Sequence, residues 1–310
     1  MLNEIVVEDT IDATHLVFSP DGSEICIQDS CLHYLLLVYS IDGHLLCRYQ
    51  AYEDELGLKG LSWSPSGQFL ALGSYDQTVR LMTPVTWKPA LSYPHAAHPS
   101  AMPSALKCVQ LTENIFVERV EREEGDGWDD DESVFGGSVQ PGAVLKDLSN
   151  RSTAVISPSL LKERQGAAGV TFVRRCPRKM HVVAPDPRKA DPRLGVGQMG
   201  WSHDGRYLAT RNDNMPTTLW IWDTHSVGLL SVAVFLDPIR SFKWSPNTAT
   251  LALCSGNQRV YLWKADPSGV EWVDIPGDGF ACLGLRWAPG GQYLALLSRD
   301  TFFVCSMVEA

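Results

Sequence analysis

The chain has 310 residues, of which 45% are hydrophobic and 20% are charged, a composition typical of a globular protein with a packed core. Its formal net charge of −10 disfavours contact with the phosphates of nucleic acids and of anionic lipids, so we expect no nucleic-acid partner. No apolar run is long enough to cross a bilayer, and no basic segment followed by an apolar one opens the sequence. We therefore expect neither membrane insertion nor a signal peptide.

The eight cysteines are spread along the chain, and none of them forms a C-x-x-C pair. Most stand among apolar residues, as Cys254 does, which indicates buried, reduced thiols and a cytosolic or nuclear protein. Because the possible ligands are not clustered, we expect no metal site.

Five segments of one pattern recur along the chain, each with an aromatic residue, a small residue and then turn formers. They begin at Phe18, Trp63, Trp201, Trp244 and Trp287. Eight residues after each aromatic residue a small residue stands in an apolar stretch, namely Cys26, Ala71, Ala209, Ala252 and Ala295. The pattern is typical of a strand, a tight turn and a second strand, and two further strands can be read in most units.

The first two aromatic residues are 45 residues apart, and the last three follow one another at intervals of 43. Four strands in such a period are typical of a WD-repeat blade, which must stack on neighbouring blades to bury its two apolar faces. The sequence therefore predicts an all-β WD-repeat β-propeller of about five four-stranded blades.

The ends of the repeat array leave its closure open. Residues 4–7 are predicted to form a strand, and the last unit stops after its third strand. The N-terminal strand could complete the last blade and close the ring. Alternatively, it belongs to an earlier blade that this chain lacks, and the ring is open or truncated.

One long insertion interrupts the repeats, because 138 residues separate Trp63 from Trp201. We divide the chain into blades one and two (1–93), the insertion (94–193) and blades three to five (194–310). Within the insertion, residues 114–120 and 169–173 are predicted as strands, residues 118–132 are strongly acidic and residues 174–193 are basic. We expect the insertion to be partly disordered.

The charged runs are interpreted either as solvated loops or as a docking strip for a partner. The acidic candidates for such contacts are Glu121, Glu123, Glu124, Asp129, Asp130 and Asp131. A second candidate is the loop after the second strand of the third unit, with Arg211, Asn212, Asp213 and Asn214. Turn-forming hydrogen bonds are the simpler interpretation of these four residues, and a polar surface patch is the alternative.

Motifs for catalysis are absent from the sequence. It contains no G-x-S-x-G elbow, no phosphate-binding loop, no dinucleotide fingerprint and no H-E-x-x-H motif. The histidines are isolated, with His95 and His98 in a segment that is read as a linker. We therefore expect no enzymatic activity, no catalytic residue and no cofactor.

Several stretches are more specific than a generic repeat. Residues 36–43, 63–76, 207–214 and 295–300 resemble the centrosomal and spindle-pole WD-repeat family whose animal member is encoded antisense to the p73 gene. The resemblance covers most of the chain and is weakest in the insertion. Family members are longer, so this chain resembles their C-terminal five repeats.

The resemblance implies a non-catalytic scaffold in a complex that anchors microtubule minus ends at the spindle pole or centrosome, with a role in ciliogenesis in animals. The implied partners are a coiled-coil protein of the SSX-interacting type and a minus-end-directed kinesin. The implied location is the cytoplasm, at the microtubule-organising centre of the cytoskeleton. From the fold alone, an adaptor of another class, such as a ubiquitin-ligase substrate receptor or a translation factor subunit, is the alternative.

Overall fold

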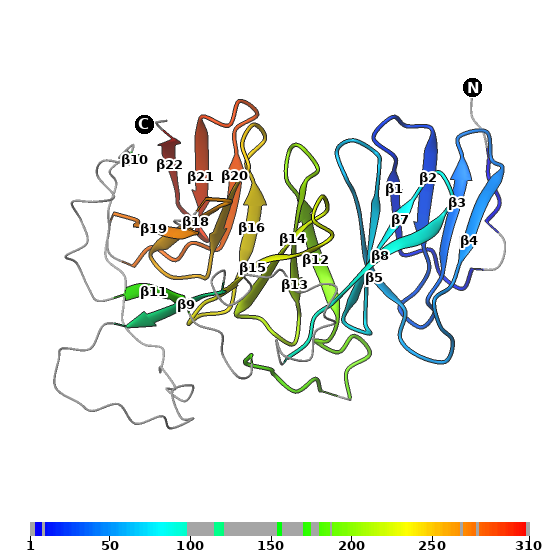
Figure 1. The fold of residues 1–310 in the computed structure, drawn as a ribbon, viewed down its shortest axis with the longest axis horizontal. Helices are drawn as coiled ribbons and strands as arrows, with labels where there is room; N and C mark the ends of the chain where they lie inside the picture. Colours follow the sequence, from blue (N-terminus) through cyan, green and yellow to red (C-terminus); the bar gives the residue numbers. More distant parts are fainter. Residues whose placement is uncertain are drawn as a thin grey trace.

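The computed structural model describes residues 4–7, 10–97, 115–120, 154–156, 170–174, 180–186, 188–266, 269–276 and 279–307. Every regular element in these ranges is a β-strand, and none of them contains a helix that could span a bilayer. The strands form five sheets that stand side by side along the long axis of the molecule (Figure 1).

The strands follow the chain blade by blade. Blade 1 contains β1 (His15–Phe18), β2 (Glu24–Gln28), β3 (Leu36–Ser40) and β4 (Leu45–Tyr49). Blade 2 contains β5 (Leu58–Trp63), β6 (Leu70–Ser74), β7 (Thr78–Thr83) and β8 (Lys88–Pro94). Blade 3 contains β12 (Val196–Trp201), β13 (Tyr207–Asn212), β14 (Thr218–Asp223) and β15 (Gly228–Val234). Blade 4 contains β16 (Ser241–Trp244), β17 (Thr250–Cys254), β18 (Arg259–Lys264) and β19 (Val270–Asp274). Blade 5 contains β20 (Gly284–Trp287), β21 (Tyr293–Leu297) and β22 (Phe302–Met307).

The insertion adds three strands to this framework. They are β9 (Ile115–Val120), β10 (Ala154–Ile156) and β11 (Val170–Arg174). Strand β9 pairs in parallel with β15, and β11 pairs antiparallel with β9, so blade 3 becomes a six-stranded sheet. The two strands that the sequence predicts in the insertion are therefore confirmed.

Within each blade, strands that follow one another in the chain are antiparallel. A tight turn joins the first two strands. In blade 1 the amide of Gly22 donates to the carbonyl oxygen of Ser19, and Gly22 has a φ of 73°. The turn of blade 3 repeats this bond from Gly205 to Ser202, and Gly205 has a φ of 72°. Glycine adopts this left-handed conformation without steric cost, which explains the recurring turn motif.

Neighbouring blades are joined by a ladder of tryptophan hydrogen bonds. Trp201 Nε1 donates to the carbonyl oxygen of Ser62 at 3.1 Å, and Trp244 Nε1 donates to that of Gly200 at 2.8 Å. Trp287 Nε1 donates in the same way to the carbonyl oxygen of Lys243, the residue before Trp244, at 2.9 Å. Each of these three tryptophans therefore ties its blade to the backbone of the blade before it.

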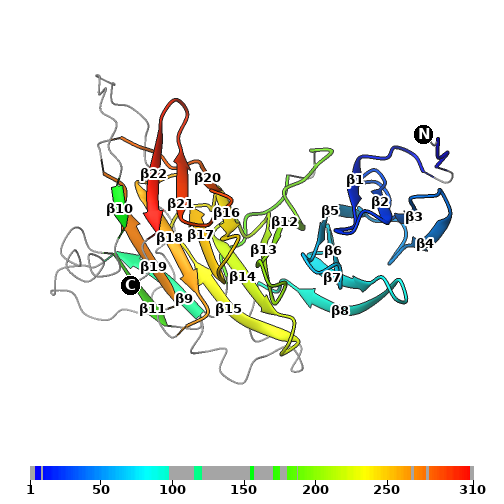
Figure 2. The same cartoon turned by 90° about the horizontal axis from the view of Figure 1, so that it is seen from above.

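The described sheets form an open arc, in which blade 1 and blade 5 lie at opposite ends in both views (Figures 1 and 2). Residues 4–7 form no strand, and Ile5 and Val7 instead pack on the outer face of blade 1 against Ile25 and Ile27. The fourth position of blade 5 is taken by β10, which pairs in parallel with β22. The predicted strand at residues 4–7 is therefore wrong, and the alternative in which it completes the last blade is excluded, because its apolar residues cover blade 1. The predicted fold class is confirmed.

Candidate interaction site on the loop face of blades 1 to 3

The junction between blades 2 and 3 is built around His95, which follows β8 and is completely buried. Trp222 Nε1 donates to the Thr210 hydroxyl at 2.9 Å, and that hydroxyl lies 2.6 Å from His95 Nε2. His95 Nδ1 lies 3.1 Å from the carbonyl oxygen of Gln77. These contacts are all satisfied when Thr210 donates to Nε2 and Nδ1–H donates to Gln77, so the ring is neutral. Burial lowers the pKa of His95 to about 4, in agreement with this state.

The predicted polar loop of blade 3 lies directly beside this histidine, but Arg211 and Asn212 end strand β13 and only Asp213 and Asn214 belong to the loop. Asn212 and Asn214 are buried, and their amide nitrogens donate to the same Oε1 of Gln77 at 3.0 and 3.1 Å. Gln77 belongs to the corresponding loop of blade 2 and has a φ of 64°. The two asparagines therefore join the loops of blades 2 and 3 to each other within the chain.

The other two residues of the predicted loop lie closer to the surface. Arg211 donates to the carbonyl oxygen of Ile239 at 2.6 Å and to the Asp213 carboxylate at 3.2 Å. Asp213 also forms an ion pair with Lys59 Nζ at 2.8 Å. A partner would meet Arg211 and Asp213 before the buried asparagines, and binding at these residues stays a prediction.

Lys59, which gives no signal in the sequence, anchors the end of the insertion to blade 2. Its Nζ donates to the carbonyl oxygens of Pro192 and Leu194 at 3.3 and 2.9 Å, and it lies 4.6 Å from the centre of the Tyr75 ring. The Tyr75 hydroxyl donates to Asp191 at 2.6 Å. This hydrogen bond, together with the nearby ammonium group of Lys59, lowers the pKa of Asp191.

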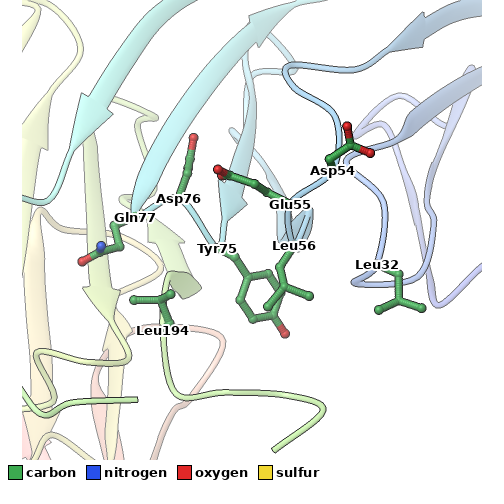
Figure 3. Close-up of a pocket in the computed structure, with 8 residues that line it drawn as sticks. All are labelled: Leu32, Asp54, Glu55, Leu56, Tyr75, Asp76, Gln77 and Leu194. Atoms are coloured by element: carbon green, nitrogen blue, oxygen red, sulfur yellow. The ribbon is translucent and has the colours of Figure 1, made fainter. Parts of the chain in front are cut away.

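A groove of about 670 Å³ opens beside these contacts, on the face that carries the loops between second and third strands. Its lining residues come from the loops of blades 1, 2 and 3 (Figure 3). They are Leu32, Asp54, Glu55, Leu56, Tyr75, Asp76, Gln77 and Leu194. Leu194, the residue directly after the insertion, thus supplies one wall of the groove.

The loop between blades 1 and 2 is held firmly against its neighbours. The amide of Gly57 donates to the carbonyl oxygen of Cys31 at 2.8 Å, and Tyr75 donates its amide to the carbonyl oxygen of Gly57 at 3.0 Å. The Tyr52 hydroxyl donates to the carbonyl oxygen of Leu56 at 2.7 Å. A Cβ on Gly57 would lie 2.1 Å from the carbonyl oxygen of His33, so only glycine fits this close approach. The groove is therefore formed before any partner arrives.

The insertion is attached a second time, at the outer rim of blades 3 and 4. Glu118 on β9 is buried and accepts hydrogen bonds from the amide of Leu236 at 3.0 Å and from the Tyr261 hydroxyl at 2.8 Å. Arg259 lies 3.8 Å from the same carboxylate. Burial raises the pKa of Glu118, and the hydrogen bonds oppose this shift. This glutamate, at the start of the acidic run, therefore attaches β9 to blades 3 and 4.

The remaining acidic candidates fall outside the part of the chain that the structure describes. They are Glu121, Glu123, Glu124, Asp129, Asp130 and Asp131. Their contact with a partner stays a prediction. In the described ranges, no three histidine, cysteine or acidic side chains are grouped so that they could hold a metal ion.

Comparisons with known proteins agree with the repeat architecture. The family model described as WD domain, G-beta repeat, matches residues 36–81 and 224–264. The mouse WD repeat-containing protein WRAP73 is 37% identical over 301 residues, which cover 96% of this chain and 57% of that protein. An uncharacterized WD repeat-containing protein of Schizosaccharomyces pombe is 21% identical over 318 residues, which cover 97% of this chain and 54% of that protein.

The chain thus spans just over half of the length of the two curated relatives. Among solved structures, a chain in the crystal structure of a mitotic checkpoint complex aligns with 98% of this chain and 80% of its own length, at a TM-score of 0.45 and 14% identity. The match to WRAP73 and the repeat model confirm the resemblance that the sequence predicts.

Proposed function

We propose that this chain, whose repeats are similar to those of WRAP73, is a non-catalytic scaffold in a complex that anchors microtubule minus ends at the spindle pole or centrosome. The observation that carries the proposal is the similarity to WRAP73 over 96% of the chain. The spindle-pole role follows from the resemblance of the repeat sequences to the centrosomal family.

The geometry supports a binding role and gives no reason to assign a reaction. The buried ionisable side chains that a catalytic site would use are engaged in contacts between blades. His95 bonds to Thr210, Glu118 to Tyr261, and Lys59 to Asp213. What remains accessible on the loop face is a groove with apolar and acidic side chains, which suits a protein partner.

The proposed partners are a coiled-coil protein of the SSX-interacting type and a minus-end-directed kinesin. The proposed location is the cytoplasm, at the microtubule-organising centre. WD-repeat blades present several loop surfaces on one rigid framework, so such a scaffold can hold two partners at once.

Affinity purification tests this proposal. The full chain, tagged at one end, is expressed in dividing cells and recovered from mitotic extracts, and the proteins that accompany it are identified by mass spectrometry. We expect a spindle-pole coiled-coil protein and a minus-end-directed kinesin, both absent from a purification of the tag alone. Recovery of cullin or ribosomal proteins in their place would show that the scaffold belongs to another class.

A further inference from the structure

The apolar and the acidic side chains of the groove on the loop face lie in separate rows. In Figure 3, Leu194, Tyr75, Leu56 and Leu32 follow one another across the view, and the carboxylates of Asp76, Glu55 and Asp54 lie along one side of this row. The row runs from Leu194, directly after the insertion, to Leu32 in the loop of blade 1. The groove therefore offers an apolar strip with an acidic border.

The negative charge of this border is concentrated at the blade 1 end. On blade 2, the negative charge of Asp76 is balanced by Arg80, whose guanidinium group lies 2.6 Å from the Asp76 carboxylate. Asp54 and Glu55 are exposed, and neither forms an ion pair with any residue that the structure describes. Glu53, next to them, is exposed as well. At the other end of the groove, Lys59 Nζ lies 2.9 Å from the carbonyl oxygen of Leu194, and its charge is paired with Asp213 at 2.8 Å.

The apolar strip is accessible at the same end. Leu32 is 62% exposed although its loop is ordered by a hydrogen bond from the amide of His33 to the carbonyl oxygen of Ser30, at 3.1 Å. Covering this exposed leucine would remove apolar surface from water. Because Gly57 and Tyr52 fix the acidic loop opposite, little order is lost when a ligand binds.

We propose that this groove binds a short amphipathic segment of a protein partner, with leucine-type side chains on one face and lysine or arginine side chains on the other. The apolar face would cover Leu32 and Leu56, and the basic side chains would meet Asp54 and Glu55. Opposite charges at the border steer such a segment and fix its direction, whereas the same carboxylates repel the phosphates of nucleic acids and lipids. The inference deepens the proposed function and rests only on its protein-binding part.

The test uses a defined probe and the full chain. A fluorescein-labelled peptide with leucine and lysine segregated to opposite faces of a helix is titrated with the protein, and its anisotropy is measured at two salt concentrations. A peptide of the same composition with the two residue types mixed is the control ligand. We expect the segregated peptide to bind more tightly, with an affinity that falls as salt increases.

Substitutions of the lining residues test whether the peptide binds in the groove. Asp54→Lys combined with Glu55→Lys should weaken binding roughly tenfold, because two attractive charges become repulsive. Leu32→Ser should weaken it about threefold, because less apolar surface is covered. The matched control, Asp42→Lys with Asp300→Lys, changes the net charge equally at exposed turns of blades 1 and 5 and should leave binding unchanged. All of these side chains are exposed, and thermal unfolding of each variant checks that the fold is retained.

Several results would overturn the inference. They are no binding of the segregated peptide, equal binding of the mixed peptide, or the same loss in the control variant as in the groove variant. Self-association of the chain that the groove variant abolishes, measured by sedimentation, would identify a second copy as the occupant instead. If peptide binding fails while spindle-pole proteins are still recovered by affinity purification, the groove is excluded and the scaffold function stands.

Discussion

The junction between blades 2 and 3 is held by polar side chains, whereas the junction between blades 3 and 4 is held by aromatic rings. His95 and Phe235 occupy the same position after the fourth strand of the preceding blade, and each donates its amide to the carbonyl oxygen just before the third strand, at 3.0 and 2.9 Å. His95 then bonds to Thr210, but Phe235 packs 5.0 Å from the ring of Tyr261.

The difference shows that one backbone framework accepts two kinds of junction. The aromatic junction is stabilised mainly by apolar burial. The polar junction depends on complete hydrogen bonding, since an unpaired group there would cost more than a lost contact. It also binds the end of the insertion through Lys59, so the candidate groove is formed at the polar junction.

The largest loss of stability should come from adding a side chain where the backbones of blades 2 and 3 approach each other most closely. A Cβ on Gly73 would lie 2.1 Å from the carbonyl oxygen of Val196, and backbone atoms there cannot move aside. We expect Gly73→Ala to lower the free energy of unfolding by more than about 3 kcal/mol. Gly284→Ala, whose Cβ would lie 3.6 Å from the Leu297 side chain, is the control and should be tolerated. Equal losses in urea denaturation would contradict this account of the junction.

Removing a threonine hydroxyl should lower the free energy of unfolding only where that hydroxyl makes hydrogen bonds. Thr210→Val leaves His95 Nε2 and Trp222 Nε1 without partners, and we expect a loss of about 2–3 kcal/mol in the free energy of unfolding. Thr218→Val is the matched control, because that buried hydroxyl makes no hydrogen bond with any residue that the structure describes. It should be neutral or stabilising. A neutral Thr210→Val would mean that the network contributes little.

The polar junction should also make stability depend on pH. The pKa of His95 is lowered to about 4 by burial, so the unfolded chain takes up a proton first as the pH falls below about 6.5. The attraction of Asp76 acts in the opposite direction and is smaller. Stability is therefore fully present above this pH and should fall by about 2 kcal/mol between pH 7 and pH 5. His95→Gln should remove this dependence, and an unchanged slope in the variant would assign it to other groups.

The smallest effect is expected at the aromatic junction. Tyr261→Phe keeps the ring packing on Phe235 and removes the hydrogen bond to Glu118, whose carboxylate retains the amide of Leu236. We expect a loss of about 1 kcal/mol in the free energy of unfolding. Hydrogen exchange at β9 should become faster, because Glu118 attaches that strand to blade 4. A loss as large as that of Thr210→Val would show that this junction is also governed by its polar contacts.

The repeats could be predicted from the sequence because each blade is encoded locally. The aromatic residue, the turn formers and the small residue recur at fixed spacing, and alternating apolar residues also reveal β9 and β11 within the insertion. Strand β10 could not be predicted, because only three residues pair with β22 and their register depends on the assembled arc.

The contacts of the site depend on residues that are far apart in the sequence. The composition around His95 predicts a linker, because its partner Thr210 lies 115 residues further along the chain. Lys59 looks like an ordinary strand residue until the insertion returns to it 133 residues later. For Asn212 the composition indicates a turn, but its burial against Gln77 follows only from the stacking of blades 2 and 3.

Microscopy of dividing cells tests the proposed function most directly. A fluorescent fusion of this chain is imaged together with a marker of the spindle poles. We expect the fusion to concentrate at the poles through mitosis, as a scaffold that anchors microtubule minus ends must. A folded fusion that stays diffuse while the poles remain marked would contradict the proposal that these blades act as a spindle-pole scaffold.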